Sequence, residues 1–167
     1  MASREIDLPT GPDRPSPDVA EWLSRARLGQ RDAHYAALLG LRRYDSLHLV
    51  DQIARGLSYS AFARFQRNTG LPVQELSALV EVPERTLARR KESGRLQPDE
   101  SDRLARAARL FARAMELFEG DVDAARVWLL SPRPALGGRK PLEFARSDIG
   151  AIEVVNLIGR LEHGIPT

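Results

Sequence analysis

The sequence predicts an all-α protein in which an N-terminal helix-turn-helix domain is followed by a second, small helical domain. Three observations predict this class. Apolar residues recur at three- and four-residue spacing from Leu47 to Leu161, the period of helices that bury one face. Glycine or proline stands where most of these periodic segments end. Finally, two short helical segments between Val73 and Glu92 are separated by a tight turn.

The first forty-four residues divide into two parts. Residues 1–17 contain four prolines among polar residues, which predicts a disordered arm because little of this segment can be buried. Residues 18–44 are expected to form a partly helical extension, in which Asp18 can cap a short helix ending near Gln30. The apolar segment from Ala33 to Leu41 does not fit either a helix or a strand clearly enough to be assigned.

Residues 45–96 are expected to form the helix-turn-helix domain. The first helix of this domain ends at Gly56, and five apolar residues at helical spacing give it one apolar face. That face consists of Leu47, Val50, Ile53, Ala54 and Leu57. A second helix follows and ends at Gly70, with Phe62 and Phe65 on one side.

The segment from Val73 to Glu92 has the spacing of a helix-turn-helix unit, with its turn at residues 81–83. The small Ser77 lies where the two helices would cross. The apolar Val82 lies in the turn, and Leu87 can fill the angle between the helices. These features resemble those of bacterial Xre/Cro-type domains.

Two residues of the turn depart from that resemblance. Glu81 stands where such units usually carry glycine, at a position that often needs a positive φ. Pro83 stands where a capping serine or threonine is usual. The departure at Glu81 is expected to cost roughly 1 kcal/mol without preventing the fold.

The outward side of the second helix of this unit can contact DNA. The predicted contact residues are Arg85, Thr86, Arg89, Arg90 and Lys91. From Glu84 to Arg113 there are nine basic and five acidic residues, and a local excess of this kind gives salt-dependent affinity for DNA. The alternative is an arginine-rich face that is only solvated.

A long helix is expected over residues 97–120, because Pro98 suits the first helical position and the carboxylates that follow complement the helix dipole. Its apolar stripe is wide enough to need more than one neighbour. Core packing can supply these neighbours, but the flanking arginines also allow the stripe to pack against a second copy of the chain. The residues predicted to form this dimer contact are Leu104, Phe111, Met115 and Phe118.

Residues 121–167 are expected to form the second domain. After its first helix, the segment from Ser131 to Phe144 contains three prolines and the pair Gly137-Gly138, so it must form a shaped loop and not a helix. We call this segment the elbow. A final helix begins at residue 147 or 148 and ends at Gly164, and its apolar stripe continues almost to the last residue.

Four segments carry a resemblance to a known family. They are Gly94 to Leu104, Trp128-Leu129, Pro134 to Leu142, and Leu161-Glu162-His163-Gly164. Together they resemble the Xre/MbcA/ParS family of antitoxins, which partner RES-domain toxins. The resemblance covers the chain from about Leu47 onward, and the elbow is the most specific of its motifs.

The resemblance implies a type II antitoxin that binds a RES-domain toxin, an enzyme that consumes NAD or transfers ADP-ribose from it. In the family the C-terminal segment occludes the mouth of the toxin's NAD cleft. The matching residues here are Arg160, Leu161, His163, Gly164 and Ile165. The elbow residues that would position the final helix and contact the toxin are Pro134, Ala135, Leu136, Gly137, Gly138, Pro141 and Leu142.

The same resemblance implies that a homodimer within the toxin-antitoxin complex binds operator DNA and represses its own promoter. The serious alternative is a stand-alone dimeric helix-turn-helix repressor, whose C-terminal half would sense a ligand or only dimerise. These alternatives differ in one respect. Only the antitoxin needs its C-terminal segment for protection against a toxin.

Several other classes are disfavoured by the composition. The three histidines have no metal-ligand spacing, and no nucleophile-base pair or phosphate loop is visible, so we expect no enzyme activity, no metal and no cofactor. There is no cysteine, no signal peptide and no apolar run that could span a membrane. We therefore expect a cytoplasmic protein that does not bind membranes.

Overall fold

The computed structural model describes residues 31–41 and 46–165, and within these ranges it is helical, with two isolated β-bridges and no longer strand. The helices are α2 (Arg31–Leu39), α3 (Ser46–Arg55), α4 (Tyr59–Thr69), α5 (Val73–Val80), α6 (Glu84–Ser93), α7 (Pro98–Leu117), α8 (Val122–Leu130), the 3₁₀ turn η1 (Pro134–Leu136), α9 (Pro141–Phe144) and α10 (Asp148–Glu162). The predicted arm at 1–17 and the predicted helix over 18–30 lie outside the described residues. The all-α fold class is confirmed.

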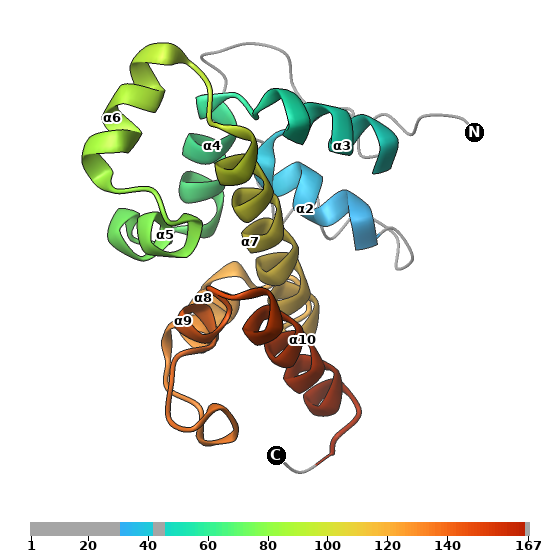
Figure 1. The fold of residues 1–167 in the computed structure, drawn as a ribbon. Coiled ribbons are helices and arrows are strands. Elements are labelled where there is room, and N and C mark those ends of the chain that lie inside the picture. The colour runs from blue at the N-terminus through green and yellow to red at the C-terminus, as the bar shows by residue number, and fades with distance from the viewer. Residues whose placement is uncertain (1–30, 42–45, 166–167) are drawn as a thin grey trace.

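The long helix α7 is the axis of the molecule, and α2, α3, α4, α5, α8 and α10 all pack against it (Figure 1). It begins as the sequence predicts, with Pro98 at its first position. The Glu100 side chain accepts a hydrogen bond from the Gln97 backbone N–H at 2.8 Å, which satisfies one of the free N–H groups at the helix start.

Helices α5 and α6 form the predicted helix-turn-helix unit. Ser77, Val82 and Leu87 are all buried where the two helices meet, as the sequence predicts. Glu81 ends α5 with φ of 55°, which confirms that this turn needs a left-handed conformation. The Ser77 hydroxyl donates a hydrogen bond to the Val82 carbonyl and so ties the helix to the turn.

In the C-terminal region α8 and α10 each pack against α7, and the short α9 packs against both α8 and α10. In the elbow, Arg133 and Arg139 form an isolated β-bridge, with Arg133 N–H donating to the Arg139 carbonyl at 3.0 Å. Ser147 caps α10 by accepting a hydrogen bond from the Gly150 N–H. A Cβ at Gly150 would lie 1.8 Å from the Phe144 carbonyl oxygen, so only glycine allows α9 and α10 to approach this closely.

Two predictions about apolar faces are wrong. Leu104, Phe111 and Met115 are buried inside a single chain, so they cannot form the predicted dimer contact. The neighbour that covers α7 is largely α2, the segment that the sequence left unassigned. On α3, Leu47 and Val50 are 81% and 64% exposed, because the row of residues that includes the buried Leu49 faces the core instead.

Candidate DNA-contact and toxin-contact surfaces

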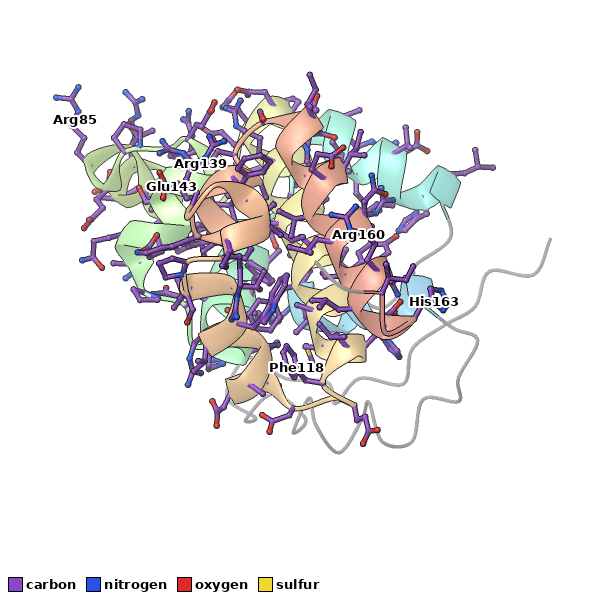
Figure 2. All side chains as sticks on the ribbon, turned by 90° about the horizontal axis from the view of Figure 1, so that it is seen from below. Arg85, Phe118, Arg139, Glu143, Arg160 and His163 are labelled. Atoms are coloured by element: carbon purple, nitrogen blue, oxygen red, sulfur yellow. The ribbon has the colours of Figure 1, made fainter. Side chains whose placement is uncertain are left out.

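The outer side of α6 carries three exposed cationic residues, Arg85, Arg89 and Lys91, while Thr86 is half-buried. Figure 2 shows Arg85 extending away from the body of the molecule. Among the described residues these three side chains have no carboxylate partner. Unpaired cations on an exposed helix of this unit are suited to contact phosphates.

The fifth predicted DNA contact, Arg90, lies on the opposite side of α6. Its guanidinium forms a two-pronged ion pair with Glu100 of α7, with N–O distances of 2.9 to 3.1 Å. The two side chains are only 16% and 8% exposed. The prediction that Arg90 contacts DNA is therefore corrected, because this arginine joins α6 to α7.

Glu100 is held in its charged form by this arrangement. Burial by itself opposes ionisation of the carboxyl group. The hydrogen bonds from Arg90 and from the Gln97 N–H outweigh that effect and keep the pKa of Glu100 below its ordinary value. The ion pair thus fixes the angle at which α6 leaves the body of the molecule.

The elbow residues fall into two groups. Pro134, Ala135, Gly137 and Gly138 are exposed and available to a partner. Leu136, Pro141 and Leu142 are buried, so they cannot contact a toxin directly, and their predicted role is corrected to shaping the loop from within.

Three cationic side chains hold the elbow in place. The Arg133 guanidinium lies 5.2 Å from the Trp128 ring, and Arg139 lies 4.2 Å from the Phe144 ring, both in cation–π geometry. Lys140 forms an ion pair with Glu75 of α5 at 2.9 Å, which attaches the elbow to the helix-turn-helix unit.

The predicted C-terminal contact residues form a folded turn at the end of α10. Arg160 and Leu161 are half-buried, whereas His163, Gly164 and Ile165 are exposed. The Ile165 N–H donates to the Arg160 carbonyl at 2.9 Å, and Gly164 has a φ of 65°. These features end the helix with a left-handed residue and keep the side chain of Ile165, which is 50% exposed, at the surface.

The end of α10 is also attached to α7. Arg113 donates a hydrogen bond to Glu162 at 3.0 Å and pairs with Glu116 on its own helix. Figure 1 places the end of α10 and the elbow in the lower part of the molecule and α6 in the upper part. The two candidate surfaces therefore lie apart.

Residues 31–41 and 46–165 contain neither a metal-binding cluster nor a membrane-spanning helix. No group of three histidine, aspartate or glutamate side chains in residues 31–41 and 46–165 is arranged to hold a metal ion. No helix in the same part of the chain is long and apolar enough to cross a membrane.

Local sequence accounts for only one of the two contacts that Glu100 makes. A glutamate three residues into a helix that starts with proline indicates a capping interaction, and that interaction is present. Its second partner is ten residues upstream on another helix, and no periodicity connects the two positions.

The fold and these surfaces define an all-helical helix-turn-helix protein with a second helical region that ends in an exposed, folded turn. Residues 48–109 match the family model of the antitoxin Xre-like helix-turn-helix domain, and residues 113–164 match that of the antitoxin Xre/MbcA/ParS C-terminal toxin-binding domain. The chain belongs to the Xre family of antitoxins, which are binding proteins and not enzymes.

Relatives in three bacteria support this assignment. The chain is 38% identical over 128 residues to a protein named antitoxin Xre from Yersinia enterocolitica, covering 76% of this chain and 86% of the relative. It is 34% identical over 119 residues to an antitoxin Xre from Photorhabdus laumondii, covering 71% and 80% of the two chains. An antitoxin Xre from Pseudomonas putida is 33% identical over 84 residues, covering 50% and 52%.

Proposed function

We propose that this antitoxin neutralises a RES-domain, NAD-consuming toxin by placing the turn at the end of α10 in the mouth of the toxin's active-site cleft. The observation that carries the proposal is that this turn is both exposed and ordered. It is exposed, yet it is folded and attached to α7 through Arg113 and Glu162. A segment that is already ordered loses little conformational entropy when it enters a cleft.

The charge at this end fits the proposed target. Arg160 is the basic residue in the last turn of α10, and Figure 2 shows it on the same helix as His163. A guanidinium can pair with the acidic groups that line a cleft and so keep a substrate out of it. The turn would therefore compete with NAD.

We further propose that the antitoxin, alone or with its toxin, binds operator DNA through the outer side of α6 and represses its own promoter. The support is the set of exposed cations at Arg85, Arg89 and Lys91, which have no carboxylate partner among the described residues. Binding to a two-fold operator requires a homodimer, and its contact must use surface other than the buried face of α7.

Truncation after Glu162 tests the occlusion proposal. This variant keeps all of α10 and the Glu162–Arg113 ion pair, so it should melt at the same temperature as the full chain. It should still bind a cognate RES-domain toxin but should fail to inhibit NAD consumption. A matched control, Arg85→Ala, should inhibit as well as the unchanged chain.

Two outcomes would contradict the proposal in different ways. If the truncated chain inhibits the toxin fully, occlusion by the terminal turn is wrong. If the full chain binds the promoter but neither binds nor inhibits any such toxin, the stand-alone repressor is the better description.

A further inference from the structure

A groove of about 380 Å³ lies between α7 and α10. Three arginines of α7, Arg106, Arg109 and Arg113, line one side of it. The apolar side chains of Ile152 and Val155 line the other side from α10. The groove therefore combines positive charge with aliphatic surface along its length.

The two outer arginines are already neutralised by carboxylates on both helices. Arg106 pairs with Asp102 at 2.7 Å and also with Asp148 at the start of α10. Arg113 pairs with Glu116 and, at 3.0 Å, with Glu162 at the end of α10. These pairs connect the two helices at both ends of the groove.

The central arginine is different. Arg109 is exposed, and its guanidinium lies 5.0 Å from the ring of the buried Tyr35 of α2. In the part of the chain that the structure describes, no carboxylate pairs with it. The contact with Tyr35 thus holds the Arg109 side chain in position, while its positive charge remains available to pair with a carboxylate of a partner.

Within residues 31–41 and 46–165, no element covers the exposed aliphatic side chains on the apolar side of the groove either. Ile152 is 60% exposed, and Ile149, one turn earlier on α10, is exposed to a greater extent. Adjacent large aliphatic side chains that remain exposed next to a shaped groove mark a surface suited to a protein partner.

We propose that this groove receives a segment of the toxin that carries aliphatic side chains and at least one carboxylate, which would pair with Arg109. The inference rests on the proposed function. It is supported by continuity, because six of the nine residues that line the groove fall within the toxin-binding match at 113–164. The Arg113–Glu162 pair connects this groove to the turn that would enter the cleft.

The two contacts have separate roles in this arrangement. The terminal turn blocks the cleft, and the groove supplies affinity at a second point. Arg109 is the last residue of the helix-turn-helix match, so the toxin would contact α7 as well as the toxin-binding domain. The bound toxin would therefore also contact α7, the helix to which α6 is attached through the Arg90–Glu100 ion pair.

The test uses the full antitoxin and the cognate RES-domain toxin of the proposed function. Two groove variants, Arg109→Glu and Ile152→Asp, are compared with two matched controls on α3, Arg55→Glu and Val50→Asp. Val50 is 64% exposed, close to Ile152, and Arg55 is an exposed arginine on α3, a helix that contributes no lining residue to the groove. Melting temperatures establish that all four variants fold.

Each groove variant should raise the Kd for the toxin by about tenfold or more, whereas the α3 controls should change it by less than about twofold. At saturating antitoxin the groove variants should still inhibit NAD consumption completely, because the terminal turn is intact. A further variant, Arg109→Gln, should bind with a smaller dependence on salt than the unchanged chain.

Toxin affinity equal to that of the unchanged chain in both folded groove variants would overturn the inference while leaving the proposed function standing. The inference would also be overturned if these variants only shifted a dimer to a monomer in sedimentation, since the groove would then bind a second copy. If the unchanged antitoxin does not bind the toxin, the proposed function itself fails.

Discussion

Helices α6 and α7 are both rich in arginine, yet the two sets of arginines have opposite surroundings. On α6, Arg85 and Arg89 are exposed and, among the described residues, have no carboxylate partner. On α7, Arg103, Arg106 and Arg113 each pair with carboxylates on their own helix and on another element. The same residue type is thus available for binding on one helix and used for packing on the other.

Each helix also has one arginine that is an exception to this pattern of carboxylate pairing. Arg90 of α6 is paired and mostly buried against Glu100, whereas Arg109 of α7 has no carboxylate partner in the described chain. The position of an arginine on its helix, and not the charge of the segment, therefore decides its role. Removing arginines one at a time tests this distinction.

The largest effect is expected from Arg90→Ala. This change leaves the Glu100 carboxylate, whose side chain is 8% exposed, without its guanidinium partner. Loss of one partner of a largely buried pair should lower the free energy of unfolding by about 3 kcal/mol, measured by chemical denaturation. The neighbouring variant Arg89→Ala should change it by less than about 0.5 kcal/mol, and equal losses in the two variants would contradict the comparison.

A smaller effect is expected in acid, where part of the stabilisation from the Arg90–Glu100 pair should be lost. The folded-state pKa of Glu100 lies below its ordinary value, because the hydrogen bonds from Arg90 and Gln97 outweigh the effect of burial. The folded protein then binds fewer protons at this group than the unfolded chain does. The stabilisation is complete above the unfolded pKa of about 4.5 and is lost as the pH falls through the folded pKa.

The variant Glu100→Gln isolates this titration. It should be less stable than the unchanged chain at neutral pH, but its stability should fall less steeply below pH 4.5. The other carboxylates titrate in both proteins, so the difference between the two slopes reports Glu100. Denaturant unfolding across this pH range provides the measurement, and identical slopes would show that the carboxyl group is not held in its charged form.

The sequence predicted the features that depend on local chemistry. The left-handed conformation at Glu81, the proline start of α7 and the capping serine of α10 follow from neighbouring residues and are all present. The burial of Ser77, Val82 and Leu87 also follows, because the short turn leaves the two helices few ways to cross. Local geometry fixes each of these features.

The failures involve elements that are distant in sequence. From sequence alone the stripe of α7 can pack in the core or against a second copy, because α2, the helix with the most extensive contact to α7, has no clear periodicity. Leu47 and Val50 lie on a different side of α3 from the buried Leu49, and only contacts with elements distant in sequence decide which side faces the core. The groove could not be predicted at all, because it exists only where α7 and α10 lie side by side.

The third prediction concerns DNA. The double variant Arg85→Ala, Arg89→Ala should weaken binding to the antitoxin's own promoter by about tenfold and lower the dependence of affinity on salt, because two phosphate contacts are lost. The measurement is a titration at several salt concentrations. Arg160→Ala, on α10, is the matched control and should bind DNA normally, and an unchanged affinity in the double variant would remove α6 from the DNA contact.

The smallest effect is expected at Glu81, in the turn between α5 and α6. Its φ of 55° is unfavourable for a residue with a side chain, so Glu81→Gly should raise the free energy of unfolding by about 0.5 kcal/mol and the melting temperature by a degree or two. The gain is limited because glycine makes the unfolded chain more flexible. It is also limited because the contact between Glu81 and Arg103, at 3.6 Å, is lost.

The variant Glu81→Gln separates these two contributions. It keeps the strained backbone and removes only the charge, so it should be as stable as the unchanged chain or slightly less stable. Arg103 would retain its hydrogen bond to the Val80 carbonyl at 2.7 Å, and α7 would still hold the end of α5. If glutamine stabilises the protein as much as glycine does, the backbone is not strained, and the charge of Glu81 is the unfavourable feature of the turn.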